Sequence, residues 1–151
     1  MVIKKVLVAV DGSEGAGKAL DFALDLAEKF DASVMILNVS ESLVIGSVPK
    51  EAVAYSGGNA AAVSGRDLEM DHDEILSRSV AHAKAVKPNL SVSSMLKEGD
   101  PATEIVDVAK EDGFDVVVVG NKGFGLVKEL FLGSISEKVA HLAHCPVIIV
   151  K

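Results

Sequence analysis

Residues 3–14, IKKVLVAVDGSE, carry the two signals that decide the fold of this chain. Residues 6–10 are all apolar, which is typical of a strand buried on both faces of a parallel sheet. This run ends at Asp11, and Ser13 predicts the N-cap of a helix. Apolar residues then recur at helical spacing, namely Leu20, Ala23, Leu24 and Ala27. We therefore expect a strand followed by an amphipathic helix, the basic unit of an α/β sheet.

The same alternation of strand and helix continues along the chain. Further strands are expected over residues 33–39, 91–96, 115–119 and 146–150. Helices are expected over residues 66–86, from Pro101 to Gly113, and from Ser134 onward, the last with Ile135, Val139 and Leu142 facing inward. This order predicts an α/β fold with a doubly wound parallel sheet, in a single domain over residues 1–151. Residues 41–65 are expected to form a flexible insertion or loop.

Composition and charge exclude several classes of function. The length of 151 residues suits one domain. Because 15 Lys and Arg residues against 22 Asp and Glu residues leave a net charge of −7, we expect no nucleic-acid partner, which would need a basic face. The longest apolar runs, residues 6–10 and 116–119, are far shorter than the ~20 residues of a membrane span, and no signal-peptide cleavage site follows the first. A single cysteine fits a reducing compartment, so we expect a cytoplasmic protein with no membrane partner.

A glycine-rich stretch marks the candidate binding site. Ligands of doubly wound sheets bind at the carboxyl ends of the strands, and here the fourth predicted strand runs into residues 120–125, GNKGFG. Closely spaced glycines leave main-chain N–H groups uncovered for a polyanion, and the helix start at Gly133 and Ser134 favours negative charge. The hydroxyls of Ser134 and Ser136 and the ammonium of Lys122 add donors. The pattern predicts a phosphate-binding site.

The spacing Gly-two-Gly-nine-Gly-Ser over residues 120–134 resembles the ATP-binding signature of the universal stress protein family. Further segments resemble that family in the same order: residues 3–14, the turn at residues 98–101, and residues 132–151. The resemblance covers nearly the whole chain except about residues 41–65.

The resemblance implies a five-stranded parallel sheet of order 3-2-1-4-5, of the adenine nucleotide alpha-hydrolase-like kind. It also implies that adenine lies near the ends of the first two strands, and that ribose and phosphates lie along the glycine loop and the next helix start. The corresponding residues are Ala9, Val10, Asp11 and Val39 for adenine, and Gly120, Asn121, Lys122, Gly123, Gly133, Ser134, Ile135 and Ser136 for ribose and phosphates. One departure is Asn121-Lys122, where relatives often carry Ser or Thr followed by Arg or His. Lys122 keeps the charge but not the bidentate contact of an arginine.

On this resemblance the chain is an ATP-binding module that acts in stress response or signalling. A homodimer is expected through residues 146–150, because this apolar strand leaves an open sheet edge. Asp11 is the candidate Mg²⁺ ligand and base, so we expect slow or no intrinsic hydrolysis. Two alternatives stay open: an enzyme that hydrolyses ATP or transfers adenylyl groups, and a nucleotide-free protein–protein adaptor. The ligand itself is ATP or another adenine nucleotide, such as AMP or a cyclic nucleotide.

Other patterns carry less weight. Residues 12–18 satisfy the spacing of a P-loop, but Ala19 stands where the Mg²⁺-binding hydroxyl belongs. The acidic run at residues 69–74 is typical of an exposed helix start rather than of a metal site. The remaining candidates have no partners at the spacing of a metal site or of a catalytic thiol; they are His82, His141, His144 and Cys145. Asp11 fits two roles, as the cap of the first helix and as a site residue.

Overall fold

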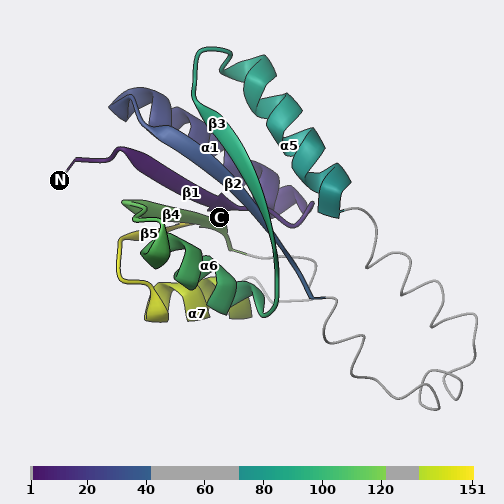
Figure 1. The fold of residues 1–151 in the computed structure, drawn as a ribbon, viewed down its shortest axis with the longest axis vertical. Coiled ribbons are helices and arrows are strands. Elements are labelled where there is room, and N and C mark those ends of the chain that lie inside the picture. Colours follow the sequence, from purple (N-terminus) through teal and green to yellow (C-terminus); the bar gives the residue numbers. More distant parts are fainter. Residues whose placement is uncertain (1, 42–71, 122–132) are drawn as a thin grey trace, which may run out of the picture.

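Five parallel strands form one sheet in the order β3-β2-β1-β4-β5 (Figure 1). The structure is a computed structural model and describes residues 2–41, 72–121 and 133–151. The strands are β1 (Lys5–Ala9), β2 (Ser33–Ser40), β3 (Val92–Glu98), β4 (Val116–Gly120) and β5 (Val147–Val150). The helices are α1 (Glu14–Phe30), α5 (His72–Val86), α6 (Pro101–Glu111) and α7 (Ser134–Leu142). The predicted α/β fold and its strand order are confirmed.

Helices cover both faces of the sheet. α1 and α5 lie on one face, and α6 and α7 lie side by side on the other (Figure 1). Val8 and Val118 are fully buried on the α1 face, whereas Leu7 and Val117 are fully buried on the α6 and α7 face. Because successive strand residues point to opposite faces, the unbroken apolar runs of β1 and β4 are buried on both sides, as predicted.

Local signals fix the two ends of α1. The Ser13 hydroxyl oxygen accepts a hydrogen bond from Ala16 N at 3.2 Å and caps the first turn. Asp31, in the left-handed conformation with a φ of 54°, ends the helix. All the residues predicted to face inward are buried, namely Leu20, Ala23, Leu24 and Ala27. The prediction for this helix is confirmed.

The inward face of α7 differs from the expectation. Val139 is buried, as predicted, but Ile135 and Leu142 are 38% and 49% exposed, so the prediction for these two residues is wrong. Ser136 is buried instead, because its hydroxyl finds acceptors at the start of the helix. The helical period predicts that the larger apolar side chains face the sheet, but the hydrogen bonds of Ser136 turn a different side of the helix inward.

Several predictions lie outside the described residues. They concern the loop or insertion over residues 42–65, the first residues of the helix expected at 66–86, and the site residues Lys122 and Gly123. The described part of that helix, α5, begins at His72. No helix in the described ranges is long and apolar enough to span a bilayer.

Candidate functional site

The carboxyl end of β1 leads into a tight turn before α1. Val10 N donates to Leu37 O of β2 at 2.8 Å, which continues the strand alignment one residue past β1. Asp11 Oδ1 accepts a hydrogen bond from Ser13 N at 2.9 Å, and Gly12 has a φ of 86°, where glycine is favoured. Because Ser13 caps α1, the alternative role of Asp11 as the cap is wrong. The Asp11 carboxylate instead holds the turn at the strand end.

Ala9 and Val39, the other residues predicted near the adenine, lie on neighbouring strands. Both are half-buried and pack against the apolar cluster on the α6 and α7 face of the sheet. Ala9 pairs with Leu37, so Val39 lies two residues further toward the carboxyl edge. The ends of β1 and β2 thus form an apolar rim beside the Asp11 turn.

The end of β4 is joined to both β5 and α7 through Asn121. Asn121 N donates to Val150 O at 2.8 Å, and Asn121 O accepts from Gly133 N at 2.8 Å. The Ser136 hydroxyl donates toward Asn121 O at 3.2 Å and Gly133 O at 2.9 Å. The two predicted halves of the phosphate site, Gly120–Asn121 and Gly133–Ser136, are therefore brought together by main-chain hydrogen bonds.

The first turn of α1 lies directly against the end of β4. A Cβ atom added at Gly120 would be 2.9 Å from the main-chain carbon and oxygen of Gly15, closer than real Cβ atoms come. This contact places the Asp11 turn and the Asn121 junction at one edge of the sheet, as the sequence predicts. It also shows that Gly120 is needed for packing within the protein itself.

The start of α7 offers main-chain donors. Gly133 occupies the N-cap position and provides no side-chain hydrogen bond to the first turn. Ser134 and Ile135 are exposed there, whereas Ser136 is buried. Because the Ser136 hydroxyl donates to main-chain carbonyl oxygens, the expectation that it offers a donor to phosphate is not supported. Ser134, by contrast, is exposed at this helix start, and its contact with phosphate stays a prediction.

A buried oxygen at the same junction lacks a hydrogen-bond partner. Among the described residues, Asn121 Oδ1 is a buried side-chain oxygen to which no donor is directed. Buried carbonyl oxygens in native proteins are nearly always paired, since an unpaired one costs about 1–3 kcal/mol. This oxygen can accept from a donor outside the described residues, whether a further part of the chain or a ligand hydroxyl group.

Asp100 fixes the helices on the opposite face of the sheet. It caps α6 by accepting hydrogen bonds from Thr103 N at 3.0 Å and Thr103 Oγ1 at 2.7 Å, and it pairs with Lys138 of α7 at 3.2 Å. The Thr103 hydroxyl, the Thr103 main-chain N–H and the Lys138 ammonium lower the pKa of Asp100 below its ordinary value. α6 and α7 are thereby tied together one turn from Ser134.

The sequence analysis missed two polar residues near this edge. Asn38, on β2, is 1% exposed and donates from Nδ2 to Val10 O at 2.6 Å. Its Oδ1 is hydrogen-bonded to Nδ1 of His72, the first residue of α5. The signal in the sequence is a single amide inside the otherwise apolar core of a strand, but its partners are distant in sequence and only the structure identifies them.

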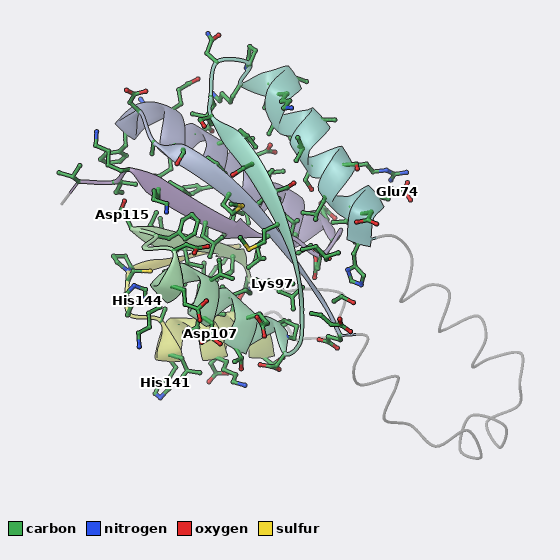
Figure 2. All side chains as sticks on the ribbon, viewed as in Figure 1. Glu74, Lys97, Asp107, Asp115, His141 and His144 are labelled. Carbon is green, nitrogen blue, oxygen red and sulfur yellow. The ribbon has the colours of Figure 1, made fainter. Side chains whose placement is uncertain are left out.

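The competing sites are not assembled. α1 begins at Glu14, so most of the P-loop-like stretch 12–18 is helix rather than a phosphate-wrapping loop. His82 pairs with Asp21 at 2.6 Å, and no group of three or more potential metal ligands gathers in the described ranges. Burial raises the pKa of the Cys145 thiol, which disfavours a nucleophilic thiolate. Figure 2 shows His141 and His144 near the end of α7, where the chain turns toward β5.

The described residues form a doubly wound α/β protein with a candidate main-chain ligand site at the carboxyl edge of its sheet. The chain belongs to the universal stress protein family, whose family model matches residues 3–151. It is 35% identical over 150 residues to the universal stress protein YxiE of Bacillus subtilis, covering 99% of this chain and 100% of that relative.

Solved structures of the same family are similar throughout. The universal stress protein UspA from Lactobacillus plantarum has a TM-score of 0.78 and 23% identity, over 100% of this chain and 99% of that one. A universal stress protein in complex with cAMP has a TM-score of 0.68 and 25% identity, over 99% of this chain and 98% of that one.

Proposed function

We propose that this protein is an adenine-nucleotide-binding module of the universal stress protein family, with ATP as its ligand. The observation that carries the proposal is the Asn121 junction, where β4, β5 and the start of α7 meet around a buried oxygen that lacks a donor. The relative in complex with cAMP supports an adenine nucleotide as the ligand class. The uncapped start of α7 supports an anionic group beside it.

The proposed ligand spans the carboxyl edge of the sheet. Adenine would lie on the apolar rim of Ala9 and Val39, beside Val10 and Asp11. A ribose hydroxyl would donate to Asn121 Oδ1. The phosphates would accept from the main-chain N–H groups of Ser134 and Ile135 and from the Ser134 hydroxyl. A micromolar nucleotide needs about 8 kcal/mol, so these contacts must act together.

Hydrolysis is proposed to be slow or absent. Phosphoryl transfer needs a positioned water, a base and usually Mg²⁺, which neutralises charge developing on the phosphates. Asp11 lies just after the carboxyl end of β1, and its Oδ1 already accepts from Ser13 N. Asp11 would hold Mg²⁺ together with the nucleotide phosphates, and the proposal assigns no residue as the base.

The decisive experiment measures ATP binding and the fate of the bound nucleotide. We expect purified protein, once denatured, to release intact adenine nucleotide on chromatography. Ser134→Ala should weaken ATP binding by about tenfold, because a charge-assisted hydrogen bond is lost. Ser94→Ala, at an exposed position on β3, is the matched control and should leave ATP binding unchanged. Rapid Mg²⁺-dependent release of ADP or AMP would instead establish the enzyme alternative. An absence of binding at millimolar ATP would favour the adaptor.

Gly133 is unsuitable for this test. A Cβ atom at Gly133 would lie 2.5 Å from the main-chain oxygen of Asn121, so Gly133→Val disrupts the junction whether or not a nucleotide is present. The expected loss of ATP binding in that variant therefore would not identify a phosphate contact.

We also propose a homodimer through β5. The sheet order leaves β5 at an edge, where no other described strand pairs with its outer side. Phe22 and Phe30 of α1, which contacts β5, are 43% and 45% exposed. The two phenylalanines lie about two helical turns apart on one side of α1. The side of α1 that faces α5 is a different one, because Asp21 pairs with His82 of α5 and Asp25 pairs with Lys87 just beyond α5. An open apolar edge beside an exposed apolar stripe is suited to a second copy.

A further inference from the structure

Asn38 is a buried amide in an apolar setting. It lies on the same face of β2 as Val34 and Ile36, both buried, and is itself 1% exposed. Burying an amide without hydrogen bonds costs several kcal/mol in an apolar medium. Its hydrogen-bond partners are therefore the reason that the residue is tolerated at this position.

The Asn38 side chain holds the main chain at the adenine end of the site. The regular pairing of β1 ends at Ala9, yet both main-chain polar groups of Val10 are bonded to β2. Val10 N donates to Leu37 O at 2.8 Å, and Val10 O accepts from Asn38 Nδ2 at 2.6 Å. The next residues are Asp11 and Gly12, and the positive φ of Gly12 turns the chain. Asn38 thus fixes the last peptide before that turn.

The same hydrogen bonds define the tautomer of His72. Val10 O can only accept, so the nitrogen of the Asn38 amide faces it and the oxygen faces His72. That oxygen can only accept in turn, so His72 Nδ1 carries the proton. The resulting chain of hydrogen bonds runs from His72 through Asn38 to Val10, and it joins His72 to a residue 34 positions earlier in the sequence.

We propose that Asn38 and His72 are positioning residues for the adenine end of the nucleotide site. The pair ties the start of α5 to the end of β1 and holds Val10 and Asp11 in the conformation that receives the base. This inference rests on the proposed function, because it concerns the same site. Preorganising a main-chain surface raises affinity by reducing the entropy lost on binding.

The test combines four variants with one control. Asn38→Leu, His72→Leu and the double variant remove the hydrogen bonds, whereas His72→Asn keeps a donor near the position of Nδ1. Ile36→Val, a fully buried change on the same strand and face, lowers stability without touching the pair. ATP affinity is measured by calorimetry at a temperature where melting curves show every variant folded. The His72 tautomer of the wild type is measured by long-range ¹H–¹⁵N correlation.

We expect each single leucine variant to bind ATP at least about fivefold more weakly than the wild type. The double variant should bind about as weakly as the weaker of the two single variants, because the two residues act as a unit. His72→Asn and Ile36→Val should stay within about twofold of the wild type. His72 should be protonated at Nδ1.

Three results would overturn the inference. A neutral His72 protonated at Nε2 would contradict the hydrogen-bond chain, even if the leucine variants failed to fold. Wild-type affinity in the leucine variants would refute positioning while leaving the nucleotide proposal intact. A wild-type protein that binds no adenine nucleotide would refute the proposed function, and the positioning role with it.

Discussion

Single glycines set the spacing between elements at the carboxyl edge of the sheet. Gly120 allows β4 to lie against the first turn of α1, and Gly133 allows α7 to start against Asn121 O. Both glycines belong to the signature that suggested phosphate binding, yet each is also required by contacts within the protein. Their presence alone therefore does not distinguish a ligand site from a tight structural junction, so the proposed site is tested at Ser134 instead.

Gly120→Ala is expected to destabilise the protein by about 1–3 kcal/mol, because the added methyl group collides with the main chain of Gly15. Gly17→Ala is the matched control within α1. A Cβ atom at Gly17 meets nothing within 4 Å, so this variant should be more stable by about 0.5–1 kcal/mol. Urea denaturation measures both free energies of unfolding. Equal stability of the two variants would contradict the close packing of β4 on α1.

Asp115 ties the start of β4 to the strand beside it. Its Oδ2 accepts from Lys4 N at 2.8 Å and Lys5 N at 2.9 Å, and these bonds lower its pKa below the ordinary 3.8. Figure 2 shows Asp115 and Glu74 toward opposite ends of the molecule, so a change at Asp115 is remote from the start of α5.

Because the folded pKa of Asp115 is depressed, its stabilising effect is complete above about pH 3.8 and is lost as the pH falls through the folded value. Asp115→Asn should therefore unfold more easily than the wild type at neutral pH, and the difference should vanish in acid. Urea denaturation at a series of pH values measures this difference. If the difference in the free energy of unfolding between the two proteins did not depend on pH, the ionised Asp115 carboxylate would not be the stabilising group.

At the scale of elements, caps and hydrogen bonds between elements set the geometry of the site. α7 begins at Ser134 because Gly133 N and the Ser136 hydroxyl are anchored on main-chain oxygens, and this anchoring turns Ser136 rather than Ile135 inward. α6 begins at an Asp100 cap that also pairs with Lys138 of α7. The two helices on this face are thus oriented together.

Asp100→Ala should cost about 1 kcal/mol, since the N-cap hydrogen bonds of α6 are lost. Asp100→Asn keeps the capping oxygen but loses the charge, and the exposed ion pair with Lys138 contributes little, so a smaller loss is expected. Thermal denaturation at neutral pH ranks the two variants. If the asparagine variant were as unstable as the alanine variant, the ion pair rather than the cap would be the main contribution.

At the scale of the whole molecule, β5 lies at one edge of the sheet, and no other described strand pairs with its outer side. Pro146 O and Val150 O accept from β4, so the alternating residues Val147 and Ile149 direct their N–H and C=O groups toward the outer edge. In the proposed dimer these groups would pair with a strand of the second copy. The net charge of −7 on each copy opposes association, so added salt should favour it.

Sedimentation at micromolar concentration should give twice the chain mass of 15.7 kDa. Ile149→Pro removes one outward N–H and should shift the protein toward the monomer. The paired surface variant Phe22→Glu with Phe30→Glu should do the same without changing β5, since it places charge on the apolar stripe. A wild-type monomer, or variants that remain dimeric, would refute dimerisation through this edge.

The sequence by itself determined the order of the elements and the family of the protein. Unbroken apolar runs are a local property, so β1 and β4 and the buried face of α1 could be predicted. Asp11 and Gly120 lie at the carboxyl edge of the sheet, as predicted, whereas the phosphate site at that edge stays a prediction. These signals lie within one element or between neighbours in the chain.

The tertiary structure alone decided which polar groups meet. Ser136 replaces Ile135 on the inner face of α7 because the main-chain oxygen of Asn121, just after β4, lies there. Asn38 is buried because Val10 and His72 satisfy its amide. A hydrogen bond depends on distance and direction between atoms that are far apart in the chain. Periodicity and composition contain neither, so these contacts had to be found in space.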